Sequence, residues 1–146
     1  MDEESFAIVS SSDRIMVGIV RVPGFPKETF FMGGYDAECA IEIQCNGFSA
    51  KGHSYFSTAM FHEFYNNLNQ THITLRGIAK FSSYENDFYL EAESDGIGHV
   101  LIRGSFSKEP GNELKYYFET DQTFILKTLN DLSKIASKYG NELGVK

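Results

Sequence analysis

The sequence has no apolar run close to the roughly 18 residues that a membrane-spanning helix requires. Its first four residues, Met1 to Glu4, are mostly acidic, whereas a secretory signal starts with basic residues ahead of an apolar segment. From these two absences we expect a cytoplasmic protein that neither crosses nor enters a membrane.

Basic residues are in the minority, because 13 Lys and Arg stand against 20 Asp and Glu, for a net charge of −7. Binding to nucleic acid depends on a basic stripe that neutralises phosphates, so nucleic acid is excluded as the main partner. Anionic membrane surfaces are disfavoured for the same reason. An acidic surface fits a basic protein partner, whose opposite field would speed encounter, and it equally fits a charge that only maintains solubility.

Cysteine is scarce, with only Cys39 and Cys45 in the chain. If both lie on one strand, the six steps between them span about 20 Å. A disulfide requires Cα atoms about 5.5 Å apart, so we expect two free thiols and a reducing compartment. Both cysteines fall on the apolar face of that strand, where a thiol usually packs and does not react.

Motifs for catalysis and for metal or cofactor binding are missing. No Gly-x-Ser-x-Gly elbow is present, and the four histidines and two cysteines include no His-x-x-x-His or Cys-x-x-Cys pair. The glycines of Gly96-Ile97-Gly98 precede a strand pattern, whereas a phosphate cradle opens a helix. We therefore expect no catalytic, metal or cofactor-binding residues.

What the chain does contain is enough apolar sequence for one domain. Its 146 residues are 42% hydrophobic and can bury a core without disulfides or metals, so residues 1–146 are predicted to form a single domain. In residues 36–45 apolar and polar side chains alternate, which indicates a strand with one packed face. Asn46-Gly47 follows and predicts a hairpin leading into a strand over residues 48–56.

Further strands are predicted on both sides of a helix, and a second helix closes the sequence. Apolar residues at helical spacing predict helices over about 57–69 and 121–139, the second capped by Asp121. Short turns join the remaining strands, so we expect an antiparallel meander. The predicted fold is α+β: an antiparallel sheet of about six to eight strands with both helices packed on one face. The other predicted strands are residues 6–9, 14–22, 73–79, 88–93, 100–106 and 114–118.

A loop is predicted at Pro23-Gly24-Phe25-Pro26-Lys27, because two prolines and a glycine interrupt any regular element there. The loop carries Phe25, and Phe30 and Phe31 follow shortly after it.

Acidic and aromatic side chains on the polar faces of two strands are the candidate partner-binding residues. If the two faces adjoin, the carboxylates form an acidic patch in which tyrosines, including Tyr55, supply the aromatic anchors enriched at interfaces. Alternatively, basic side chains on neighbouring strands neutralise the carboxylates. The candidate contacts are Glu38, Glu42, Tyr89, Glu91 and Glu93, and the neutralising residues are Lys51, Arg76, Arg103 and Lys115.

Several segments between Tyr35 and Leu132 carry a family resemblance. They are Phe61-x-x-Phe64-Tyr65-x-x-Leu68, Gly98-His99-Val100-Leu101-Ile102, Leu114-Lys115-Tyr116-Tyr117-Phe118 and Asp121-Gln122-Thr123. Together they resemble the WapI-type immunity proteins and a related small α+β domain family of unknown function. The resemblance implies a protein that binds a bacterial toxin domain, often a nuclease, and protects the producing cell. The chain departs from the family pattern in lacking tryptophan.

Three functions follow for testing. The first is an immunity protein that binds a cognate toxin domain, basic in charge and of the nuclease type, and occludes its active site. The second is a small-ligand binding domain with a Phe- and Tyr-lined pocket between sheet and helices, against which a filled core would count. The third is an enzyme whose cleft holds His53 or His99 beside a carboxylate. The sequence leaves the oligomeric state open.

Overall fold

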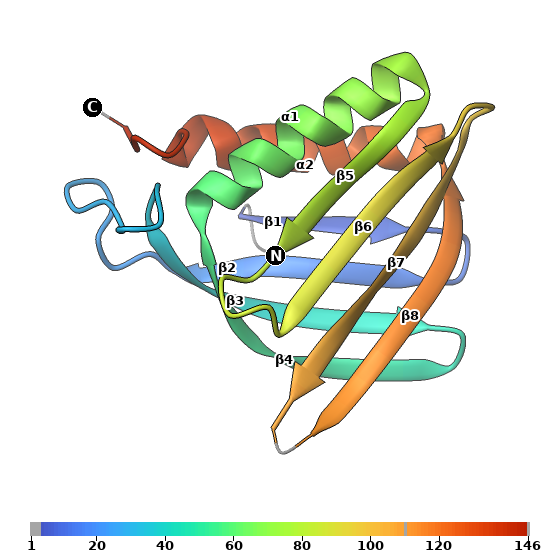
Figure 1. Cartoon of the computed structure of the whole chain (residues 1–146), viewed down its shortest axis with the longest axis horizontal. Helices are drawn as coiled ribbons and strands as arrows, with labels where there is room; N and C mark the ends of the chain where they lie inside the picture. Colours follow the sequence, from blue (N-terminus) through green and yellow to red (C-terminus); the bar gives the residue numbers. More distant parts are fainter. Residues whose placement is uncertain (1–3, 110, 146) are drawn as a thin grey trace.

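The computed structural model describes residues 4–109 and 111–145, which form eight strands and two helices (Figure 1). One sheet has the strand order β1-β2-β3-β4 and the other the order β5-β6-β7-β8. The first sheet consists of β1 (Ser5–Val9), β2 (Arg14–Arg21), β3 (Asp36–Cys45) and β4 (Phe48–Ser57). The second consists of β5 (Arg76–Ser82), β6 (Phe88–Asp95), β7 (His99–Lys108) and β8 (Asn112–Asp121).

Every neighbouring pair of strands is antiparallel, which confirms the α+β class and the predicted meander. The strands form two sheets because helix α1 (Thr58–Thr74) separates β4 from β5 in the sequence. After this helix, β5 starts a new sheet that crosses in front of the first (Figure 1). The sequence pattern predicted the strands but not their division into two sheets.

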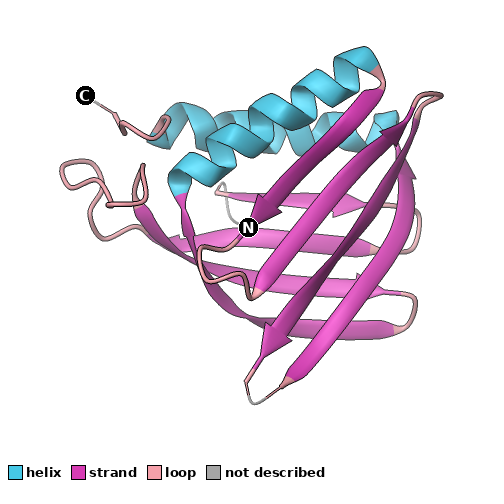
Figure 2. Cartoon of the chain, viewed as in Figure 1, coloured by secondary structure: helices cyan, strands magenta, loops and turns pink. Residues whose placement is uncertain are grey.

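Both helices lie side by side on one side of the molecule (Figure 2). Helix α1 packs along β5, and helix α2 (Gln122–Tyr139) packs along β1. These strands are the first edges of the two sheets, so the helices cover backbone edges that could otherwise pair with another chain. The arrangement closes one open side of the two-sheet core.

Helix α1 runs to Thr74, although the asparagines and glutamine around residues 66–70 predicted an end near residue 69. These polar side chains lie mostly on the outer face, while Leu68 and Thr71 remain buried. Tertiary packing therefore outweighs the low helix propensity of asparagine. At the start of the helix, Ser57 is the cap, and its Oγ accepts a hydrogen bond from the Ala59 N–H at 3.1 Å.

The space between the sheets and the helices is filled by aromatic rings. Phe81 lies at the centre, stacked on Phe56 with ring centroids 4.9 Å apart and in edge-on contact with Phe6 at 5.3 Å. The rings of Phe61, Phe64 and Phe88 complete the cluster, and all six residues are fully buried. A filled aromatic core counts against the Phe- and Tyr-lined ligand pocket considered from the sequence.

Candidate partner-binding surfaces

Tyr89, Glu91 and Glu93 lie together on the outer face of β6, as the sequence predicted. Arg103, in the neighbouring strand β7, contacts both carboxylates: its Nε lies 2.6 Å from Oε1 of Glu91 and its NH2 lies 2.7 Å from Oε1 of Glu93. Lys80 lies opposite Glu91 on the other neighbouring strand. The negative charge of this cluster is therefore largely compensated locally.

The Tyr89 hydroxyl donates a 2.6 Å hydrogen bond to Oε2 of Glu91. That bond, with the neighbouring Arg103, holds the pKa of the Glu91 carboxyl below its ordinary value. Burial and the bond to the carboxylate raise the pKa of Tyr89 to about 12. Tyr89 is therefore a neutral hydrogen-bond donor near neutral pH, and much of its polar end is already engaged within the chain.

Glu38 and Glu42 lie on the outer face of β3, which belongs to the other sheet. Arg21 Nε lies 2.7 Å from Glu38 Oε1, and Arg14 NH1 lies 3.9 Å from Glu42 Oε1. Lys51 is the cross-strand neighbour of Glu42. These carboxylates too are matched by basic side chains on adjacent strands.

The five candidate contacts thus form two clusters on two sheets. Because the inner faces of the sheets share one core, their outer faces do not merge into a continuous acidic patch. Of the basic residues considered from the sequence, Arg103 bonds directly to the acidic cluster and Lys51 faces Glu42. A partner contact at either cluster stays a prediction.

A different surface gathers aromatic rings at one end of the molecule. Phe31, Phe30, Tyr84 and Tyr55 form a continuous row, which we call the aromatic ridge. Successive ring centroids are separated by 4.7 Å, 5.2 Å and 6.3 Å. The ridge joins the loop after β2, the turn after β5 and the strand β4, which are far apart in the sequence. Phe31 is 90% exposed and the adjacent Met32 is 50% exposed.

The loop that carries Phe30 and Phe31 is fixed to the start of α1. The Tyr35 N–H donates to Thr58 Oγ1 at 2.7 Å, and the Thr58 N–H donates back to the Tyr35 carbonyl at 2.9 Å. Gly34 N–H donates to the Glu142 carbonyl at 2.8 Å, which ties the loop to the C-terminal segment as well. Gly34 has φ of 62°, and a Cβ there would lie 2.6 Å from Thr58 Oγ1.

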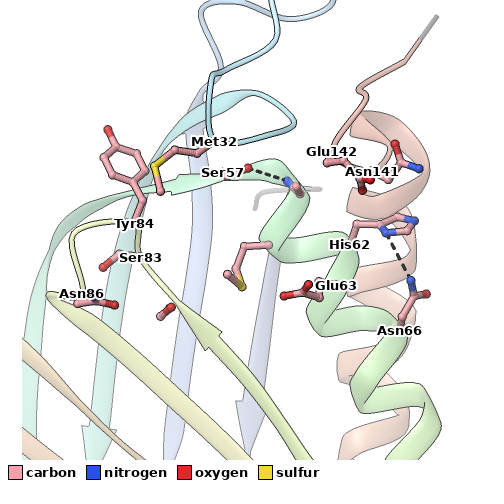
Figure 3. Close-up of a pocket in the computed structure, with 13 residues that line it drawn as sticks. Met32, Ser57, His62, Glu63, Asn66, Ser83, Tyr84, Asn86, Asn141 and Glu142 are labelled. Atoms are coloured by element: carbon pink, nitrogen blue, oxygen red, sulfur yellow. Dashed lines mark hydrogen bonds between the residues drawn. The ribbon is translucent and has the colours of Figure 1, made fainter.

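Beside the ridge lies an open groove of about 730 Å³ between the loop, the start of α1 and the turn after β5 (Figure 3). Met32 and Tyr84 line one side, and Glu63 and Glu142 project from the other. Among the described residues, no lysine or arginine lines the groove. Neither Glu63 nor Glu142 has an ion pair in the described part of the chain, in contrast to Glu38, Glu42, Glu91 and Glu93 on the sheet faces.

The sequence identified part of this surface. The Pro- and Gly-containing segment predicted a loop with Phe30 and Phe31 close behind it, and Tyr55 was recognised as an aromatic anchor. Tyr84 was missed as a partner of these residues, because its proximity depends on the packing of the second sheet against the first. The backbone N–H of Tyr84 donates to the carbonyl of Tyr55 at 3.1 Å, which joins the turn after β5 to the strand β4 of the other sheet.

The histidines considered for catalysis both lie near carboxylates. His99 Nδ1 is 3.0 Å from Asp95 Oδ2 and 3.5 Å from Glu119 Oε2, and half of its side chain is exposed. His53 lines an open depression together with Asp87 and other acidic residues. Among residues 4–109 and 111–145, no group of three or more His, Cys, Asp or Glu side chains is placed to hold a metal ion.

An exposed aromatic ridge beside an acidic groove is the kind of surface that marks a protein-binding domain. The comparison with known families agrees, because residues 7–140 match the immunity protein WapI-like family. The chain belongs to this family, which confirms the resemblance seen in the sequence. No curated protein matches the chain. No helix in the described residues is long and apolar enough to cross a membrane.

Proposed function

We propose that this protein is an immunity protein that binds a cognate bacterial toxin domain in the cytoplasm and blocks its active site by occlusion. Membership of the WapI-like immunity family over residues 7–140 carries this proposal. The proposed mode of action is binding without catalysis. A nuclease with a basic surface is the partner that suits the net charge of −7, because opposite fields speed association.

A complex of this kind would bury roughly 1,200–2,000 Å² of surface. Glu38 and Glu42 on one sheet, and Tyr89, Glu91 and Glu93 on the other, remain proposed contacts. Since the two groups lie on different sheets, one toxin domain of ordinary size would not contact both groups at the centre of its interface. Of the two, the β6 group has the larger concentration of acidic and aromatic side chains.

The test is co-expression of the tagged chain with the C-terminal domain encoded by a neighbouring toxin gene. We expect a stoichiometric complex on size-exclusion chromatography and growth of cells that the toxin domain alone would kill. Absence of both complex and growth would overturn the proposal for that pair. A complex without protection would mean that binding leaves the toxin's active site open, and would overturn occlusion.

The contribution of the β6 cluster is tested by reversing Glu91 and Glu93 to lysine in one variant. We expect weaker toxin binding if these carboxylates meet a basic surface. The matched control reverses Glu113 and Glu119, which are exposed on β8. Unchanged affinity in the Glu91 and Glu93 variant, with its fold intact by circular dichroism, would remove this cluster from the interface.

A further inference from the structure

We infer that the toxin partner docks on the aromatic ridge and the adjoining groove, and that the partner surface it meets there is basic. This inference rests on the proposed immunity function and specifies its contact surface. The surface comprises Phe30, Phe31, Met32, Tyr55 and Tyr84 with the carboxylates of Glu63 and Glu142.

Exposure of the ridge is the first observation behind the inference. Phe31 leaves 90% of its surface in water, and Met32 beside it leaves half. Leaving a large aromatic side chain in water forgoes a burial free energy that folding could otherwise have used. Contiguous exposed apolar side chains of this kind mark binding sites, and aromatic residues and methionine are the types enriched in interface cores.

Rigidity of the loop is the second observation. The exchange of hydrogen bonds between Tyr35 and Thr58, and the bond from Gly34 to the Glu142 carbonyl, hold the segment that presents Phe31. A partner that meets a fixed loop loses less conformational entropy than one that must order a mobile loop. A loop ordered by the chain itself, with its aromatic side chain pointing into solvent, is therefore suited to act as an anchor.

The charge of the groove is the third observation, and it indicates a basic partner. Glu63 and Glu142 face the groove without ion pairs in the described structure, and the groove has no lysine or arginine of its own. Lysine or arginine from a partner would satisfy these carboxylates and could also lie over the faces of the neighbouring rings. A second copy of this chain would instead bring another surface of the same acidic protein, with a net charge of −7, to the groove. A basic protein is thus the better occupant.

The experiment uses the full chain and the C-terminal domain of the neighbouring toxin gene as the probe. Phe31→Ser removes the most exposed ring of the ridge, and Phe48→Ser is its control, because Phe48 is also an exposed phenylalanine but follows the β3–β4 turn. We expect Phe31→Ser to raise the dissociation constant at least about 30-fold, as for a central hot spot, and Phe48→Ser to leave it within about 3-fold.

The electrostatic part is tested by Glu63→Gln with Glu142→Gln. We expect a slower association rate and a weaker dependence of that rate on salt concentration. The control is Glu113→Gln with Glu119→Gln, which removes the same amount of charge from β8. Equal effects of the two double variants would mean that only the net charge matters, and would overturn a basic contact at the groove.

The outcomes separate this inference from the function on which it rests. If the unaltered chain does not bind the toxin domain, the proposed function is overturned and this inference with it. If the unaltered chain binds and Phe31→Ser binds equally well, the docking surface is wrong while the immunity function stands. Self-association of the chain that is abolished by Phe31→Ser would assign the ridge to a second copy and also overturn the inference.

Discussion

Arg103 Nε lies 2.6 Å from Glu91 Oε1, directly across the register of β6 and β7. The same guanidinium reaches Glu93, so one basic residue serves two carboxylates that the sequence alone presents as a potential binding patch. The two glutamates of β6 therefore do not form an uncompensated acidic patch. Among the described residues, Glu63 and Glu142 at the groove beside the aromatic ridge have no ion pair.

The bond between Tyr89 and Glu91 gives the first prediction. Tyr89→Phe removes the donor that contributes most to the lowered pKa of Glu91, so that pKa should rise toward its ordinary value of 4.5. A carboxyl with a lowered pKa stabilises the fold above its unfolded pKa, and this contribution is lost as the pH falls through the folded pKa. The variant should lose about 1 kcal/mol at neutral pH and less in acid. Urea denaturation at a series of pH values measures the loss of stability at neutral pH and in acid. An equal loss at all pH values would contradict the link between the pKa of Glu91 and stability.

Phe81 tests the aromatic core. Its ring is fully buried and touches five other phenylalanines, so Phe81→Ala should lower the free energy of unfolding by about 3–5 kcal/mol. If the alanine variant does not fold, Phe81→Leu provides a smaller and measurable loss. Phe48→Ala, at an exposed position, should change stability by less than about 0.5 kcal/mol. Chemical denaturation would contradict the packing if the Phe81 and Phe48 variants were equally stable.

Gly34 tests how the exposed loop is held. Gly34→Ala would place a Cβ 2.6 Å from both the Ala59 nitrogen and Thr58 Oγ1, at a positive φ. Gly47→Ala also has a positive φ but meets nothing within 4 Å, so it isolates the backbone strain of about 1 kcal/mol. We expect Gly34→Ala to cost distinctly more than Gly47→Ala in thermal denaturation and to weaken partner binding. Equal losses of stability in the two variants would mean that the loop moves to accommodate the added Cβ at Gly34.

The two thiols should resist modification in the folded protein. Cys39 is fully buried and Cys45 is nearly so, and burial raises the pKa of both thiols, which lowers the fraction of reactive thiolate. A thiol reagent added at neutral pH should label the native chain slowly and the urea-unfolded chain rapidly at both sites. Fast stoichiometric labelling of the native chain would contradict the burial of these residues.

Local patterns in the sequence determined most of the secondary structure. Alternation in residues 36–45 and the Asn46-Gly47 turn define β3 and the hairpin to β4, and Asp121 caps the second helix at the predicted position. These features depend on residues that are close together in the sequence, so they can be predicted from one sequence. The end of α1 was missed because the burial of Thr71 depends on distant elements.

The sequence by itself determined an α+β fold with antiparallel strands, two free buried thiols and the resemblance to the immunity family. Only the tertiary structure decided that the strands divide into two sheets, that Arg103 compensates the β6 carboxylates and that Tyr84 meets Phe30. The physical reason is the separation along the chain between the residues that interact. Periodicity, turns and caps follow from adjacent residues, whereas the pairing of charges and the gathering of exposed rings follow from packing between segments distant in the chain.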